Sequence, residues 1–191
     1  MFPDVGGIAA YVTATVGVRP YRQLRPEDFC IESDRAHLTV EKGNSNELRI
    51  FVSRTYTRRA LSAGVFEFQQ PLHTDGAVWK KAKCTYNGRS NALNHGSQSS
   101  LQQRKFVLAV GDRLKFELES EQVIPLANGV YQYSVFGKRE SASYVFENRV
   151  SDFAPKAHLI RESSLAPIQS SPIPTTFING DSGATFQLIW K

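Results

Sequence analysis

A four-residue string near the carboxyl end of the chain could carry nucleophilic chemistry. Gly180-Asp181-Ser182-Gly183 places a serine between small and acidic residues. A serine hydroxyl becomes a nucleophile when a histidine base lies within hydrogen-bond reach and a carboxylate orients that base. His37 and Asp75 precede Ser182 and supply one residue of each type. The string therefore raises a serine hydrolase as one hypothesis.

The same string resembles the sequence around the nucleophile of trypsin-like serine proteases, in which the chain order is also His, Asp, Ser. The resemblance ends after four residues, because Ala184 and Thr185 stand where that family continues with Gly-Pro. Nine residues follow Ser182, whereas the family fold needs further strands there. Residues 179–183 also form a good tight turn, since glycine adopts positive φ and Asp and Ser bond to nearby amides. We favour the turn.

A basic segment points to a different chemistry. Residues 48–111 hold ten basic residues against two acids, a formal charge of +8, while the remainder holds thirteen basic and sixteen acidic residues, a charge of −3. Such asymmetry predicts an electropositive face and an anionic partner. The proposed polyanion-binding residues are Trp79, Lys81 and Lys83 from one expected strand, and Arg54, Tyr56, Arg58 and Arg59 from another.

The strand 77–86 explains this choice. Strict alternation would project Trp79, Lys81 and Lys83 to one side, where an indole can stack on a base or sugar ring while ammonium groups hold phosphate or sulfate. The competing interpretation is a solvated surface on which lysine stems cover Trp79. Cys84 falls on the opposite side with Ala82, which predicts a packed thiol. We expect Cys84 and Cys30 to remain thiols rather than form a disulfide.

The sequence contains no local pattern for a metal or a cofactor. Its histidines are scattered and lack nearby ligand partners; they are His37, His73, His95 and His158. Neither a Walker nor a dinucleotide fingerprint occurs. We expect neither a cofactor nor a metal.

Period-two alternation predicts strands along most of the chain. Leu114, Phe116 and Leu118, for example, alternate with charged residues. About ten strands are expected, at or within 8–16, 36–40, 47–58, 66–68, 77–86, 105–110, 114–118, 129–136, 143–150 and 186–190. A short helix is expected at 25–29 and one helical turn at 101–104. A two-residue loop at Gly111-Asp112 would set Val110 opposite Arg113, and so place the apolar side of one strand beside the charged side of the next. An odd-length loop or a glycine bulge is therefore expected there.

These elements predict an all-β fold with little helix, a β-sandwich of jelly-roll or Greek-key type, with a closed β-barrel as the alternative. Residues 1–191 are expected to form one domain. Within it, residues 151–176 contain four prolines and are expected to form an extended arm before the final strand. The polar stretch 89–104 is a candidate functional loop.

The first 20 residues have no Lys or Arg before their apolar stretch, so we expect no signal peptide and no membrane insertion. The cellular location stays open, with a virion as one setting. The main hypothesis is a non-enzymatic structural or attachment module, such as a virion or phage-tail component. Its partners would be copies of itself or other assembly subunits. The alternatives are a protein that binds nucleic acid or an anionic glycan, and a serine hydrolase.

Overall fold

The computed structural model describes residues 22–68, 70–71, 77–95, 100–102, 105–135, 139–151, 154–160, 169–178 and 184–190. Their regular structure is almost entirely strand, with two short 3-10 turns, η1 (Pro26–Asp28) and η2 (Leu126–Asn128). The all-β prediction is therefore confirmed for the described residues, and the position of the short helix expected at 25–29 holds a single 3-10 turn. The expected strand 8–16, together with Asp75 and Ser182, lies outside the described residues.

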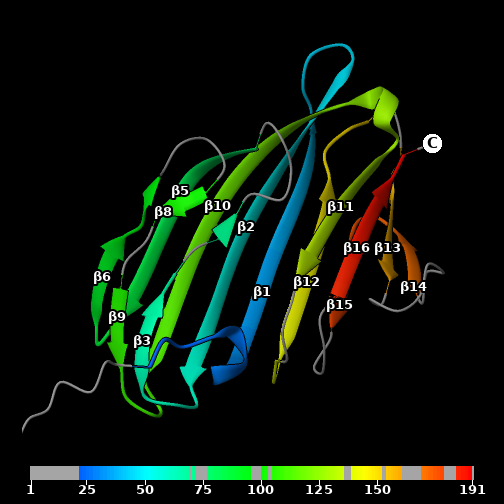
Figure 1. Cartoon of the computed structure of the whole chain (residues 1–191). Helices are drawn as coiled ribbons and strands as arrows, with labels where there is room; N and C mark the ends of the chain where they lie inside the picture. Colours follow the sequence, from blue (N-terminus) through cyan, green and yellow to red (C-terminus); the bar gives the residue numbers. More distant parts are fainter. Residues whose placement is uncertain are drawn as a thin grey trace, which may run out of the picture.

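A seven-stranded sheet forms the larger layer of the molecule (Figure 1). Its strands, in spatial order, are β15 (Thr175–Ile178), β12 (Ala142–Asn148), β1 (Phe29–Lys42), β2 (Glu47–Ala60), β10 (Arg113–Pro125), β5 (Ala77–Tyr86) and β6 (Arg89–Ala92). β2 is antiparallel to both β1 and β10 along nearly its whole length, whereas β1 and β12 are parallel. Buried residues recur at every second position in β12 and along much of β1 and β10, as the period-two pattern requires.

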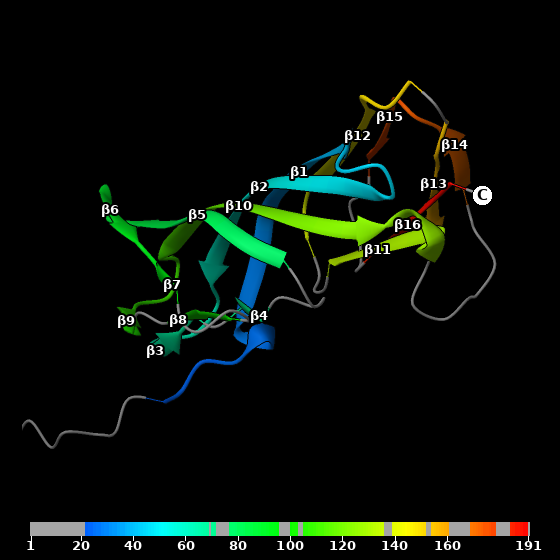
Figure 2. The ribbon, with the colours of Figure 1, turned by 90° about the horizontal axis from the view of Figure 1, so that it is seen from above.

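Three smaller sheets lie on one side of the large sheet (Figure 2). One contains β11 (Val130–Val135), β16 (Ala184–Ile189), β13 (Lys156–Ile160) and β14 (Gln169–Pro172). The second pairs β3 (Gly64–Glu67) with β9 (Lys105–Leu108), and the third joins β4 (Gln70–Pro71), β8 (Ser100–Gln102) and β7 (Asn94–His95). The layering is sandwich-like. Among the described strands no sheet closes, so the alternative of a closed β-barrel is wrong for this part of the chain.

Two separate hydrophobic cores fill the space between the layers. The first core lies under the four-stranded sheet and includes Leu38, Ile50 and Phe186. The second core lies at the other end, around a stack of three rings in which Phe116 sits 4.8 Å from Tyr56 and 4.5 Å from Phe68 between ring centroids. Both cores use the same face of the large sheet, which we call the inner face. The opposite side is the outer face.

Segments rich in proline or polar residues contribute strands where the sequence predicts none. Residues 151–176 carry β13, β14 and the start of β15, and Ala157 and Ile173 are buried in the first core. The described parts of this segment pair with other strands, whereas the extended arm over the whole of 151–176 stays a prediction. Likewise, residues 89–104 carry β6, β7 and β8 instead of one open loop, and 100–102 is strand rather than helix.

The strands on either side of Gly111-Asp112, for which an odd-length loop or a glycine bulge was expected, do not pair with each other. β9 pairs with β3, whereas β10 pairs with β2 and β5. The turn still needs its glycine, because Gly111 has a φ of +90° and donates its N–H to the Ala60 carbonyl at 2.8 Å. Neither an odd-length loop nor a bulge is required, since the two segments belong to different layers.

No helix in the described ranges is long and apolar enough to cross a membrane.

Candidate functional site

A bulge in β1 separates two carboxylates onto opposite faces of the large sheet. The pairing of β1 with β2 shifts between Ile31 and Ser33, so that Glu32 is the extra residue. After the bulge, Asp34 lies on the inner face in line with Ala36 and Leu38, while Glu32 lies on the outer face. Each carboxylate gathers arginines from other strands. The two clusters have different environments and are described in turn.

The inner cluster is centred on Asp34, which is fully buried. Arg54 of β2 donates to it from Nε at 2.8 Å and from Nη2 at 2.7 Å. The Tyr144 hydroxyl of β12 donates at 3.2 Å, and the Arg139 Nε lies 3.7 Å away. Bidentate, charge-assisted contacts of this kind are the strongest that a buried carboxylate makes. The inner cluster therefore links β1, β2, β12 and the segment at Arg139 between the two cores.

Several buried donors between the layers lack a hydrogen-bond partner within the described part of the chain. They are the Tyr56 and Tyr133 hydroxyls, the Trp79 Nε1 and the Arg58 Nε. Burial raises the pKa of Tyr56, and raises the pKa of Tyr133 to about 12. Both hydroxyls are consequently protonated donors at neutral pH. A buried donor without an acceptor is costly, so this group is the most unusual chemical feature between the layers.

Arg54 and Arg58 flank the ring of Tyr56. Their guanidinium carbons lie 4.5 Å and 5.3 Å from the ring centroid. Arg58 also lies about 6 Å from the rings of Phe29, Phe66 and Phe116. Cation–π attraction of this kind favours a guanidinium at the edge of an aromatic core. Two positive charges are thus held beside one tyrosine.

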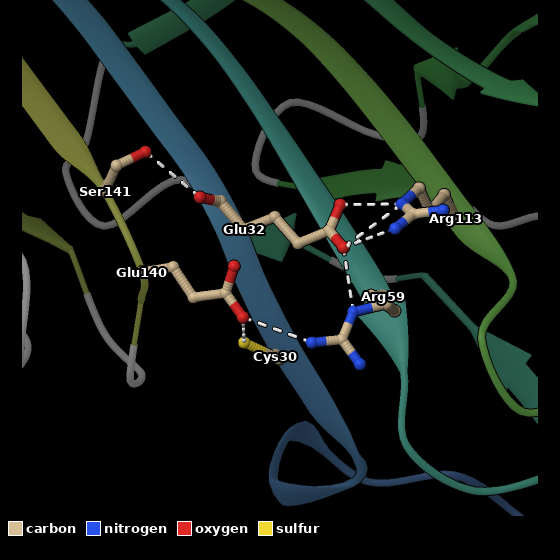
Figure 3. A network of polar contacts seen from close by, with 6 residues as sticks. All are labelled: Cys30, Glu32, Arg59, Arg113, Glu140 and Ser141. Atoms are coloured by element: carbon tan, nitrogen blue, oxygen red, sulfur yellow. Dashed lines mark hydrogen bonds and ion pairs between the residues drawn. The ribbon is translucent and has the colours of Figure 1, made fainter.

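The outer cluster surrounds Glu32 (Figure 3). Its carboxylate accepts from the Arg59 Nε at 2.8 Å and from the Arg113 Nε and Nη2 at 2.8 Å and 2.9 Å. Arg59 also donates to Glu140 at 3.1 Å, and the Cys30 thiol donates to the same Glu140 oxygen at 3.2 Å. The hydrogen bonds from Arg113 lower the pKa of Glu32.

Cys30 is the one potential nucleophile in the outer cluster. Burial, followed by the hydrogen bond to Glu140, raises the pKa of its thiol. The thiol is therefore protonated at neutral pH and a poor nucleophile. The two cysteines, both described, are not joined in a disulfide, and Cys84 is packed in the second core as expected.

Acids and bases alternate over the rest of the outer face. Lys81 lies 3.0 Å from Glu119, Lys80 lies 2.8 Å from Glu121, and Lys115 lies 3.1 Å from Glu117. On the other side of the sheet centre, Arg149 pairs with Glu41 and Glu147, and His37 pairs with Glu147. Some of these pairs join neighbouring strands, as Lys81 and Glu119 do, and others form along one strand, as Lys115 and Glu117 do. The outer face consequently carries both signs in close alternation.

The structure does not place Trp79 beside Lys81 and Lys83, so this part of the sequence interpretation is wrong. In the pairing of β5 with β10, Lys81 lies opposite Glu119, and Trp79 lies opposite Ser120, the next residue of β10. Lys80 has no residue opposite it and is therefore the extra residue of a bulge. The extra residue reverses the alternation. Trp79 therefore packs against the second core, whereas Lys81 and Lys83 face outward.

The remaining proposed polyanion-binding residues are also divided. Arg54, Tyr56 and Arg58 lie on the inner face, and Arg59 lies on the outer face in contact with Glu32. Acids from distant parts of the sequence lie beside these bases, which is why a basic segment does not produce a uniformly basic face. Polyanion binding stays a prediction.

The described residues bear only in part on the serine hydrolase hypothesis and on metal binding. His37 lies on the outer face against Glu147, and the Ser182 and Asp75 positions are outside the described ranges, so the hydrolase hypothesis stays untested. Within those ranges no group of three His, Cys, Asp or Glu residues converges as metal ligands would.

Sequence reasoning missed the inner cluster. One signal was present, because Asp34 continues the apolar row of Ala36, Leu38 and Val40. An acid in such a row must be buried with a cationic partner. Tyr144 and Arg139 reach Asp34 only because the segment 139–148 pairs with β1, and they gave no comparable signal.

No protein-family model matches the sequence, and no curated protein is similar to it in sequence. One solved structure with a similar arrangement is a protein of Legionella pneumophila described as nutrient-binding, at 8% identity and a TM-score of 0.47. The match to it covers 83% of this chain and 67% of that chain. Another is an M1 zinc metallopeptidase from Deinococcus radiodurans, at 13% identity and a TM-score of 0.39. The match to it covers 83% of this chain but 42% of the metallopeptidase chain.

Proposed function

We propose that this protein is a non-enzymatic module that acts by protein–protein contact within a larger assembly, such as a virus particle or a phage tail. The observation that supports this most is the outer face, which no described element covers. Its side chains are open to solvent: Arg113 is 62% exposed, Lys115 51% and Lys81 45%. A broad sheet face of long strands offers a wide surface for contact.

The charge pattern favours a second copy of the chain as the partner. Alternating acids and bases can meet their opposites when the same face is rotated by 180°, as an isologous dimer requires. Apolar side chains are interspersed, since Val78 and Val123 are 55% and 40% exposed. A face of balanced charge also has little long-range attraction for a polyanion. The proposal does not depend on a jelly-roll or Greek-key strand order, which stays a prediction.

Light scattering on the purified full chain tests this proposal. We expect a mass above the 21.4 kDa of one chain that rises with protein concentration. Ser53 is exposed on the outer face between His37 and Glu119, so Ser53→Arg should shift the mass toward 21.4 kDa. The control is Ser90→Arg, on exposed edge strand β6, which should leave the mass unchanged.

A mass of one chain at every concentration would contradict self-assembly. An increase in mass that requires heparin or a single-stranded oligonucleotide at low salt would favour the polyanion-binding alternative instead.

A further inference from the structure

One strand of the outer face groups its charges by sign. β10 pairs with β2 without a shift in register, so alternate residues from Arg113 to Glu121 all face outward. Along the strand these residues are two bases followed by three acids: Arg113, Lys115, Glu117, Glu119 and Glu121. We call them the β10 charge row. Glu117 is its middle residue, with the basic end on one side and the acidic end on the other.

This order of charges is complementary to itself. When β10 is laid over a copy that runs in the opposite direction, with the two Glu117 residues at the centre, bases meet acids. Lys115 then lies over Glu119 of the second copy, and Arg113 over Glu121 of the second copy. Residues two apart on a strand are separated by about 7 Å, so the members of each pair are equally far from the centre. A two-fold axis at Glu117 forms each pair twice.

The side chains that would form the inner pairs are open to solvent. Lys115 is 51% exposed and Glu119 is 44% exposed. Each already has a partner on the same face, because Lys115 lies 3.1 Å from Glu117 and Glu119 lies 3.0 Å from Lys81. Exposed ion pairs of this kind add little to the stability of the fold. A second copy can therefore share them without weakening the monomer.

The strands beside β10 suit the same arrangement. Thr55 of β2 lies opposite Glu117, with Thr57 and Ser53 at the equivalent positions on either side. The rotation sets Thr57 over Ser53 of the second copy, and these short uncharged side chains let the two sheets approach. Lys83 of β5 lies opposite Glu117 on the other side. The centre thus contains a glutamate and a lysine from each copy rather than two carboxylates alone.

We propose that two copies of the chain associate through their outer faces about a two-fold axis at Glu117, with the two β10 strands running in opposite directions. Twisted sheets pack at about 30° and separate away from the axis. The contact is therefore centred on β10, β2 and β5, and the exposed Arg35 of β1 lies outside its centre. This arrangement rests on the proposed self-assembly, to which it adds the orientation of the copies and the residues that select it.

Charge reversal tests the arrangement, with the dimer Kd measured by sedimentation equilibrium. Lys115→Glu sets two acids over each other at two symmetric positions, and Glu119→Lys does the same with two bases. We expect each variant alone to dimerise about tenfold more weakly than the unmodified chain. An equal mixture of the two variants should return to within about threefold of the original Kd, because the heterodimer has opposite charges at every one of these positions.

The double variant Lys115→Glu/Glu119→Lys should recover the original Kd by itself. The control is Lys156→Glu on exposed β13 of the facing layer, which should leave the Kd unchanged. Thermal melting checks that each variant folds, and the double variant decides if a single variant does not. Single variants with the original Kd, or a mixture and double variant that both stay weak, would overturn this arrangement and leave self-assembly standing. An unmodified chain that is monomeric at every concentration would overturn both.

Discussion

Glu32 and Asp34 are two residues apart in β1, and each accepts several hydrogen bonds from arginines. The two carboxylates differ in how far they are exposed to solvent. The Asp34 side chain is completely buried, whereas 20% of the Glu32 side chain is exposed. Breaking a buried pair leaves an uncompensated charge and costs several kcal/mol, while an exposed pair contributes about 0–1 kcal/mol. The comparison teaches that burial, rather than the number of contacts, decides which cluster holds the fold together.

The two clusters also connect different parts of the molecule. Asp34 links three strands of the large sheet, β1, β2 and β12, and also contacts Arg139, which bridges to β1 just before β12. Glu32 links neighbouring strands of the same sheet through Arg59 and Arg113. We therefore expect the inner cluster to determine stability and the outer cluster to remain available for contact. The predictions below test that division from the largest expected effect to the smallest.

Asp34→Asn should have the largest effect. It removes the carboxylate that compensates Arg54 and Arg139, and should lower the free energy of unfolding by about 3–5 kcal/mol. Urea denaturation measures the change. The matched variant Glu32→Gln should cost about 1 kcal/mol or less. Equal losses in the two variants would refute the distinction between the clusters.

The next largest effect should come from high pH, through Tyr133 of β11 in the facing layer. The pKa of Tyr133 is raised to about 12 in the folded protein, whereas an unfolded tyrosine ionises near pH 10. The stability that this protonated hydroxyl contributes is complete below pH 10 and is lost as the pH rises toward 12. The loss should reach about 2 kcal/mol. Chemical denaturation across this range should show a shallower decline in Tyr133→Phe, and an identical decline would exclude Tyr133 as the source.

Tyr144→Phe should lower the free energy of unfolding by about 1.5 kcal/mol. The change removes one hydrogen bond to the buried Asp34 carboxylate and keeps the ring in the first core. Urea denaturation measures it, with Tyr131→Phe in the same core as a control. A stabilised Tyr144→Phe variant would mean that Asp34 does not need this donor.

Acid should produce the smallest effect, and it should act on the outer face. Hydrogen bonds from Arg113 lower the pKa of Glu32, and those from Lys115 lower the pKa of Glu117. Their contribution is therefore complete above about pH 4.5 and is lost as the pH falls below it. Because these pairs are near the surface, 1 M salt should remove most of that acid dependence. An acid dependence that is equal at low and high salt would contradict this assignment.

Strand positions were largely predictable because alternation follows directly from the half-buried environment of each strand. The segment 77–86 coincides with β5, and 47–58 lies within β2. Faces were less predictable, because the bulges at Glu32 and Lys80 reverse the alternation without a marker in the sequence. Trp79 was placed on the wrong face for this reason. Pairing was least predictable, since β9 joins β3 across 37 intervening residues.

The distribution of charge on the folded surface was likewise hard to predict from the sequence. A basic segment was visible in the sequence, but its neutralising acids, Glu32, Glu119 and Glu140, become neighbours when the strands pair. Asp34 in an apolar row was the one readable sign of the inner cluster. Tyr144, which also donates to Asp34, becomes its neighbour only when β12 pairs with β1.

Lysine footprinting by mass spectrometry tests the central claim, that the outer face is a contact surface, most directly. Acetylation is compared between dilute and concentrated protein at Lys81 and Lys115 on the outer face, with exposed Lys156 of β13 as the internal reference. The account predicts that Lys81 and Lys115 become protected at high concentration while Lys156 reacts equally in both. Unchanged labelling of all three lysines, or protection confined to Lys156, would contradict it.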